Sequence, residues 1–345
     1  MSLDVEYVLP LRWSPEVSRH SSGPLTEYLR QLSRLADITV VDGSAAATFA
    51  HHHELWSGHV RHLPPDPWPG RNGKVAGVVT GIRRARHERV VIADDDVRYD
   101  ESSLRGVVAG LDHGELVRPQ NVFTSWPWHA RWDTGRALLN RALTHDHPGT
   151  FGVRRTCFMD MGGYDGDVLF ENLELTRTVR CAGGRVVDLP GVFVGRVPPD
   201  VRHFRSQRVR QAYDDLAQPG RLLVELACLP VAVCAAVRAP GSLLGGAVAV
   251  VVLAEAGRRR AGGAAAYPRS APLWALPWLV ERSVCVWLAL AQVPRGGASY
   301  GDVRIPRAAT PVRRLRSRVP RRPDGGPGAG TVGRGAVGRV RDAPA

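Results

Sequence analysis

The order of apolar segments in the first hundred residues is the feature that most constrains the fold. Three short apolar runs are typical of buried strands: 5–11, 37–44 and 89–97. Two segments between them carry apolar residues at helical spacing: 25–36 and 73–86. This βαβαβ order predicts an α/β fold with a mostly parallel, Rossmann-like sheet flanked by helices. Such sheets bind ligands at the carboxyl ends of their strands, where Asp42 and Asp94 to Asp96 fall.

Three aspartates follow the third predicted strand, in "RVVIADDDV". Asp94 and Asp96 are two residues apart on an extended turn, so their carboxylates point the same way and can share a divalent cation with a diphosphate. Phosphatases of the haloacid dehalogenase type also use Asp-x-Asp after a strand. They place it on the first strand, with Thr or Val where this chain has Arg98. The pattern favours a diphosphate site over a phosphatase or a simple acidic turn.

Apolar runs dominate the chain after Arg221: 222–237, 240–254 and 271–293. The first two are each shorter than the ~20 residues that a spanning helix usually needs. The third carries Glu281 and Arg282 near its middle. The positive-inside rule favours a hairpin that returns to the cytosol at Arg258–Arg260, followed by an interfacial amphipathic helix. Three full spans and a soluble helical subdomain are the alternatives.

Positive charge is concentrated after residue 293. The net charge is +13, and residues 294–345 contribute +9 of it through twelve arginines and three aspartates. A basic, Pro/Gly-rich segment with almost no apolar periodicity is expected to be disordered and to seek anionic surfaces. No nucleic-acid recognition motif accompanies it, so lipid is the favoured partner. The predicted regions are 1–220, 221–293 and 294–345, with catalysis in the first.

The cysteines and the N-terminus bear on the compartment. None of the five cysteines forms a CxxC pair or has a His-rich neighbourhood, so neither a disulfide framework nor a zinc site is expected, and a reducing compartment fits best. The first ten residues include acidic side chains and no apolar core segment, so we expect no cleaved signal peptide.

Taken in order, several motifs resemble those of the family 2 glycosyltransferases, from about Val5 to Tyr213. The matching segments are "LPLRWSPE", "VVDGS", "GRNGKVAGVVTGIRRA", "VVIADDDV", the block from "GTFGVRR" to "AGGRVV", and "HFRSQRVRQAY". The last is similar to the family's QxxRW element: Gln207, Arg208 and Arg210 match it, and Gln211 stands at the tryptophan position. The resemblance implies a GT-A fold, followed here by C-terminal membrane-associated helices.

The resemblance also implies roles for individual residues. The residues expected to bind the nucleotide sugar are Pro10, Arg12, Asp42, Lys74, Asp94 and Asp95. Among them, Asp42 and Asp94 would hold the base and ribose, and Lys74, the only lysine, is either a donor contact or an exposed helix-start residue. Asp94 and Asp96 would bind Mg²⁺ or Mn²⁺. Gln207, Arg208 and Arg210 would contact the acceptor or diphosphate. His203 is either a further contact of this kind or a structural histidine.

The family's usual general base is missing. It is the aspartate of a Glu-Asp pair, and this chain has Glu171–Asn172. Asparagine cannot accept a proton at neutral pH, so Glu171 is the expected base. Glu174 is the alternative, although it could instead pair with Arg177 at i, i+3.

These observations predict an inverting glycosyltransferase at the cell membrane, with its catalytic domain on the cytoplasmic side. A nucleotide sugar, with UDP favoured, would donate to a hydroxyl of a lipid or lipid-linked glycan. A catalytically inactive membrane-attached protein that binds nucleotide sugars or glycans is the alternative: Asn172 favours it, and the intact Asp-x-Asp turn disfavours it. A nucleic-acid partner is not expected.

Overall fold

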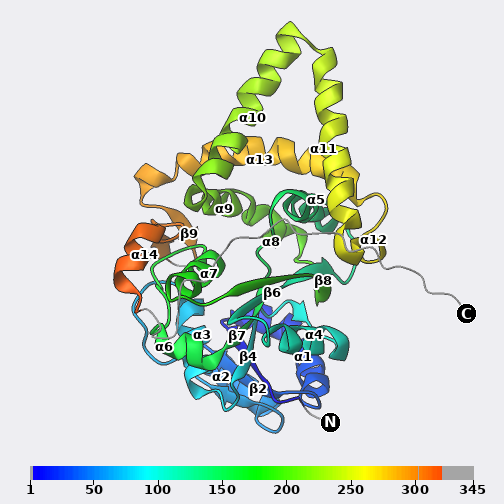
Figure 1. Cartoon of the computed structure of the whole chain (residues 1–345). Coiled ribbons are helices and arrows are strands. Elements are labelled where there is room, and N and C mark those ends of the chain that lie inside the picture. The colour runs from blue at the N-terminus through cyan, green and yellow to red at the C-terminus, as the bar shows by residue number, and fades with distance from the viewer. Residues whose placement is uncertain (1–2, 302, 321–345) are drawn as a thin grey trace, which may run out of the picture.

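A single eight-stranded sheet organises the N-terminal two thirds of the chain in the computed structural model, which describes residues 3–301 and 303–320 (Figure 1). The strand order is β3-β2-β1-β4-β7-β6-β8-β5. The strands are β1 (Glu6–Leu11), β2 (Asp37–Asp42), β3 (Arg61–Leu63), β4 (Arg89–Ala93), β5 (Val97–Arg98), β6 (Leu116–Phe123), β7 (Thr150–Arg154) and β8 (Val186–Arg196). Strands β3, β2, β1 and β4 are parallel, β7 runs antiparallel between β4 and β6, and β8 is parallel to β6.

Helices cover both faces of this sheet. Along β1, Tyr7 and Leu9 point to one face and Val8 to the other, as the two-residue period of a strand requires. The helices packed on the Tyr7 face are α1 (Pro15–Leu32), α2 (Ala46–Trp56) and α4 (Glu101–Gly110). Those on the Val8 face are α3 (Gly73–Arg84), α6 (Arg155–Asp160) and α7 (Glu171–Cys181). The α/β fold with a mostly parallel, helix-flanked sheet is therefore confirmed.

A layer of helices lies beside the sheet domain, formed by α5, which follows β6, and by the helices after β8 (Figure 1). These are α5 (Trp128–Leu143), α8 (Val201–Ser206), α9 (Arg208–Tyr213), the 3-10 turn η1 (Asp214–Ala217), α10 (Pro219–Arg238), α11 (Gly241–Arg259), α12 (Gly263–Ala266) and α13 (Ala275–Leu290). In Figure 1 the α10–α11 hairpin projects away from the rest of the molecule, and α13 crosses its base.

Within the described part of the chain, three helical segments are long and apolar enough to cross a membrane: Pro219–Arg238, Gly241–Ala266 and Ala271–Leu290. They differ in how much protein covers them. In the most apolar 18-residue stretch of each segment, the buried share is 6% in the first, 17% in the second and 39% in the third. The third segment is therefore partly a packing element of the globular body, whereas the first two expose most of their apolar surface.

The polar residues of α13 explain that difference. Arg282 is 1% exposed and its Nη1 donates to Asp215 Oδ2 at 2.9 Å. The carboxylate of Glu281 accepts a hydrogen bond from Trp132 Nε1 at 2.6 Å. Val284 and Trp287, by contrast, are exposed. The helix thus turns its charged residues toward α5 and η1 and leaves apolar residues uncovered.

The expectation of a disordered tail from residue 294 is wrong for residues 294–301 and 303–320. They include η4 (Val293–Arg295), β9 (Ala298–Tyr300), β10 (Val303–Ile305) and α14 (Val312–Arg318). Ala298 and Ile305 are fully buried against Tyr213 and Cys285. Two three-residue strands are too short to produce a visible period, so composition dominated the prediction. The rest of the predicted tail, 321–345, lies outside the described residues.

Candidate active site

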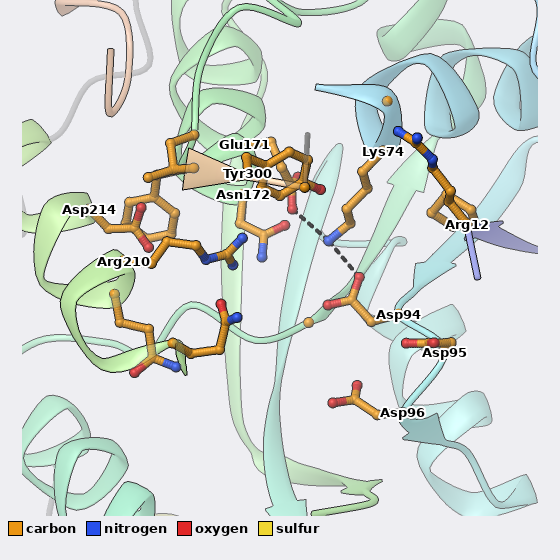
Figure 2. Close-up of a pocket in the computed structure, with 18 of the residues that line it drawn as sticks. Arg12, Lys74, Asp94, Asp95, Asp96, Glu171, Asn172, Arg210, Asp214 and Tyr300 are labelled. Carbon is orange, nitrogen blue, oxygen red and sulfur yellow. Dashed lines mark hydrogen bonds and ion pairs between the residues drawn. The ribbon is translucent and has the colours of Figure 1, made fainter. Parts of the chain in front are cut away.

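A cleft of about 990 Å³ opens at the carboxyl ends of β1 and β4. The loop after β1, the Asp94–Asp96 turn and the start of α7 form part of its wall. The other side is lined by residues from α9, η1 and β9 (Figure 2). This is where a parallel sheet is expected to hold its ligand. Of the predicted site residues, these line the cleft: Pro10, Arg12, Lys74, Asp94, Asp95, Asp96, Glu171, His203, Gln207 and Arg210.

The Asp-x-Asp turn presents two carboxylates with separate cationic partners. Asp94 Oδ1 lies 2.5 Å from Lys74 Nζ, and Asp96 Oδ2 accepts a hydrogen bond from Arg196 Nε at 2.7 Å. Asp96 Oδ1 is buried and has no hydrogen-bond partner within the described part of the chain. A side chain at position 149 would press on this turn, because a Cβ on Gly149 would lie 2.6 Å from Asp94 Oδ2. The turn therefore presents the carboxylate oxygens of Asp94 and Asp96 at the carboxyl end of β4.

Trp13 ties the loops after three strands together. Its backbone N–H donates to Ser44 Oγ at 2.9 Å, and its indole Nε1 donates to Asp95 Oδ2 at 2.5 Å. Burial, together with the neighbouring Asp96 charge, raises the pKa of Asp95 to about 6. Asp95 thus fixes the turn to the β1 loop, while Asp94 and Asp96 point into the cleft (Figure 2).

Lys74 joins the sheet side of the cleft to α7. Its position is set by Asn72, which caps α3 by accepting a hydrogen bond from the Lys74 N–H at 3.1 Å. Its Nζ lies 2.6 Å from Glu171 Oε1 as well as 2.5 Å from Asp94 (Figure 2). Burial alone would lower the pKa of Lys74, but the two carboxylates raise it well above its ordinary value. The only lysine of the chain is therefore a fixed positive charge inside the cleft.

Glu171 and Glu174 have different surroundings although both belong to α7. Glu171 lines the cleft, and burial raises its pKa, opposed by the charge of Lys74. Glu174 is 0% exposed, does not line the cleft, and accepts a hydrogen bond from the Thr310 N–H at 2.7 Å. The expected Glu174–Arg177 ion pair is wrong for the described residues, because Arg177 donates to the carbonyls of Thr310 and Ala217 instead. Of the two candidate bases, only Glu171 reaches the cleft.

Asn172 also lines the cleft, next to Glu171. Its side-chain amide donates to the Pro148 carbonyl at 3.1 Å, which fastens the start of α7 to the loop before β7. An amide in this place can position a neighbour or bind a hydroxyl, but it cannot take a proton.

Asp42, predicted to contact the base, does not line the cleft. Its carboxylate is fully buried and is bound by His52 Nδ1 at 2.6 Å, His62 Nε2 at 3.2 Å and the Ser44 N–H at 2.8 Å. These hydrogen bonds overcome the opposing effect of burial and hold the pKa of Asp42 well below its ordinary value. His52 Nε2 in turn lies 2.7 Å from Ser18 Oγ. This Asp-His-Ser chain is sealed in the interior, so no substrate can reach it.

Two of the matching residues of the QxxRW-like element line the cleft, and the third holds two helices together. Arg210 and Gln207 line the cleft, and the Arg210 guanidinium lies 5.3 Å from the centre of the Tyr300 ring. Arg208 does not line it. Its Nη1 lies 2.8 Å from Asp133 Oδ1, and its Nη2 donates to Gln211 Oε1 at 2.6 Å. Arg208 therefore holds α9 to α5, a role that its place in the motif did not reveal.

Among the cleft residues that sequence reasoning missed are Arg196, Asp214 and Tyr300. Arg196 ends β8, and a basic residue after an apolar strand gives a weak signal. Asp214 follows the QxxRW-like element closely enough to have been considered. Tyr300 could not have been found, because it returns to the cleft only after the chain has passed through all the apolar helices.

Comparison with known protein families decides the class. Residues 59–121, which include Lys74 and the Asp94–Asp96 turn, match the model of glycosyl transferase family 21, a family of the same clan as family 2. This match supports a family 2-like glycosyltransferase. The predicted enzyme class, a glycosyltransferase, is thereby confirmed, and the sheet described above agrees with the predicted fold.

Solved structures similar to this glycosyltransferase show low sequence identity. One is the mannosyltransferase PcManGT from Pyrobaculum calidifontis, in complex with GDP-Man and Mn²⁺: 18% identical, TM-score 0.46, covering 83% of this chain and 88% of that one. Another is mannosyl-3-phosphoglycerate synthase from Rubrobacter xylanophilus: 17% identical, TM-score 0.39, covering 63% and 75%. No curated protein sequence matches the chain.

Proposed function

We propose that this glycosyltransferase moves a sugar, with inversion, from a nucleotide sugar to a hydroxyl of a lipid or lipid-linked glycan at a membrane surface. The observation that carries the proposal is the Asp94–Lys74–Glu171 arrangement, which joins a candidate donor site to a candidate base within one cleft. UDP is the favoured nucleotide. Residues 1–220 would form the catalytic domain.

The donor is assigned to the sheet side of the cleft. Pro10 and Arg12 belong to the β1 loop, and Asp94 and Asp95 to the turn after β4. Lys74 brings positive charge that can balance a diphosphate. Asp42 supports the β2 end from behind; with its carboxylate fully bound, it is no longer assigned a direct contact with the base.

The residues of the Asp-x-Asp turn fit a divalent metal ion. Asp94 and Asp96 offer carboxylate oxygens, the ligands that Mg²⁺ and Mn²⁺ prefer, and Asp96 Oδ1 lacks any other partner in the described ranges. When bound there, the ion would neutralise the developing charge on the leaving diphosphate. Arg196 and Lys74 balance the two carboxylates in the free chain.

Glu171 is the proposed general base. It takes the proton from the acceptor hydroxyl as that oxygen attacks the anomeric carbon, and the bond to the diphosphate oxygen breaks on the opposite face. The diphosphate leaves with the electron pair. Because an incoming diphosphate offers Lys74 another anionic partner, donor binding weakens the hold of Lys74 on Glu171 and frees the carboxylate for the acceptor.

The membrane assignment rests on the α10–α11 hairpin. Its exposed apolar residues include Leu223, Val231, Val237, Leu244 and Val248. Arg258–Arg260 lie at its base, where the positive-inside rule puts the cytoplasm. We propose that the hairpin enters the bilayer and that α13 lies at the interface, with the catalytic domain on the cytoplasmic side of the cell membrane. A lipid-attached acceptor would then reach the cleft without leaving the membrane.

A donor screen with the purified, detergent-solubilised chain tests the proposal. Release of nucleoside diphosphate is measured for a panel of nucleotide sugars, with Mn²⁺, with Mg²⁺ and with a chelator. We expect turnover of one donor, its loss on chelation and its loss in Asp96→Ala. Binding of a donor without any hydrolysis or transfer would instead support the inactive binding protein that Asn172 favours.

A further inference from the structure

Two polar atoms on the α9–η1 side of the cleft have no partner within residues 3–301 and 303–320. They are Arg210 Nε and Asp214 Oδ1, and both are buried. Both residues line the cleft, Arg210 from α9 and Asp214 from the start of η1 (Figure 2). Buried polar groups in proteins are nearly always hydrogen-bonded, so a donor and an acceptor left open in one cleft indicate a place for a ligand that offers both kinds of group.

The neighbouring residue Asp215 has arginine partners, whereas the Asp214 carboxylate oxygen Oδ1 has none within the described residues. Asp215 lies 2.9 Å from Arg282 Nη1 and 3.0 Å from Arg221 Nε, so its charge is fully used to hold α13 and α10. Asp214 forms no such ion pair with any residue that the structure describes. Burial, opposed by the charge of Arg210, raises the pKa of Asp214 to about 7, as expected for a carboxyl without a close partner.

Tyr300 forms the third part of this region. It ends β9, in the segment that returns from the apolar helices to the sheet domain. Its ring packs on the Arg210 guanidinium at 5.3 Å from Cζ to ring centre, and Figure 2 shows it beside Glu171. A ring at the edge of a cleft offers an apolar face to the C–H side of a sugar. Three glutamine side chains line the cleft on the same side: Gln207, Gln211 and Gln218.

We propose that Arg210, Asp214 and Tyr300 form an acceptor subsite for a polyhydroxylated ring, such as a glycosyl or cyclitol head group on a lipid. The carboxylate accepts a hydrogen bond from one hydroxyl, the guanidinium donates to a neighbouring oxygen, and the tyrosine ring packs on the C–H face. A long-chain alcohol with a single hydroxyl could use only one of these three contacts. This inference rests on the proposed function and specifies its acceptor class.

Turnover measurements with two matched probes test the subsite: n-octyl β-D-glucopyranoside and 1-octanol, in a detergent that contains no sugar. We expect the glycoside to be the better acceptor by at least tenfold. Asp214→Asn and Tyr300→Ala should each raise the KM for the glycoside about tenfold, with Tyr300→Phe close to wild type. Far-UV circular dichroism of all three variants should match that of the wild type, which a general loss of structure would not allow.

Calorimetric titration of the glycoside into the full chain tests the same subsite without turnover. Binding by the wild type that weakens in Asp214→Asn supports the inference even if no donor is found. Equal acceptor use of glycoside and alcohol, or equal glycoside binding by wild type and Asp214→Asn, would overturn it. Failure of the proposed function would look different, since no donor would then be hydrolysed even by the wild type.

Discussion

Lys74 is bound to two carboxylates that the proposed reaction uses differently. Asp94 must stay with the donor side, whereas Glu171 must become free to receive a proton. A lysine is suited to this because its ammonium is a compact charge on a flexible stem and can change partners without a change in the backbone. At the scale of single residues, the question is therefore which carboxylate accepts the proton of the acceptor hydroxyl once Lys74 binds the diphosphate.

The two glutamates of α7 should respond differently to removal of charge. Glu171→Gln removes the proposed base and should lower kcat by 10²-fold or more, in line with the usual size of general base catalysis. Glu174→Gln should change kcat less than about threefold, because an amide oxygen can still accept from the Thr310 N–H and the side chain does not reach the cleft. Steady-state transfer rates of both variants decide this. Full activity in Glu171→Gln would show that the base lies elsewhere.

His87 should make the stability of the sheet domain depend on pH. Its ring lies 2.5 Å from Asp4 Oδ1 and 2.9 Å from Asp37 Oδ2, and these bonds raise its pKa although partial burial opposes them. A pKa raised in the folded state stabilises the fold below the unfolded value of about 6.5, and this stabilisation is lost as pH rises through the folded value.

The substitution His87→Gln tests this pH dependence. Its melting temperature should fall below that of the wild type at pH 6 and approach it at pH 9, measured by thermal unfolding in one detergent. A difference that stays constant or grows with pH would contradict the assigned ion pairs. His20, which is exposed and bonds only to the Glu16 carbonyl, is the control position, and its substitution should show no such trend.

Among the elements, α13 is fastened to η1 by a buried ion pair. Arg282→Met should lower stability by about 3 kcal/mol, since it removes one of the two arginines that neutralise the buried Asp215. We expect a melting temperature several degrees lower. Asp215→Asn together with Arg282→Met should cost less than the sum of the single changes. Additive single effects in this double-mutant cycle would mean that the pair contributes no coupling.

The elements that sequence predicted well are those with a local period. Strands β1, β2 and β4 and helix α3 each carry their pattern within a dozen residues, and the polar residues at their ends follow from sheet geometry. Asp42 and Arg208 could not be placed this way. Asp42 faces His52 and His62, and Arg208 faces Asp133, partners that no short pattern connects to them.

The prediction for the C-terminal segment was wrong for a related reason. Strands β9 and β10 have three residues each, and their stability comes from burying small side chains against α9 and α13. This pairing depends on where the apolar helices end, and that position is set by the whole fold. Basic composition was therefore a poor guide for residues 294–320, and Tyr300 went unnoticed.

At the scale of the whole molecule, the hairpin and the cleft are coupled by short connections. Asp214 lines the cleft, and α10 begins only five residues later at Pro219. The α13 helix then crosses the hairpin base and leads into β9, which carries Tyr300 (Figure 1). Elements on both sides of the apolar helices thus end in the candidate acceptor subsite, as expected if the acceptor arrives from a membrane.

Charges placed on the hairpin should release the protein from membranes. Val231 on α10 and Val248 on α11 are 63% and 54% exposed, so Val231→Asp with Val248→Asp leaves the body's packing intact. Each aspartate costs about 2.5–3.5 kcal/mol near the centre of an inserted helix, which together shifts partition by roughly three to five orders of magnitude. Sedimentation with vesicles should move the variant from the pellet to the supernatant. Val312→Asp, on exposed α14, should stay in the pellet like the wild type, and a double variant that also stays there would mean that the hairpin is not the anchor.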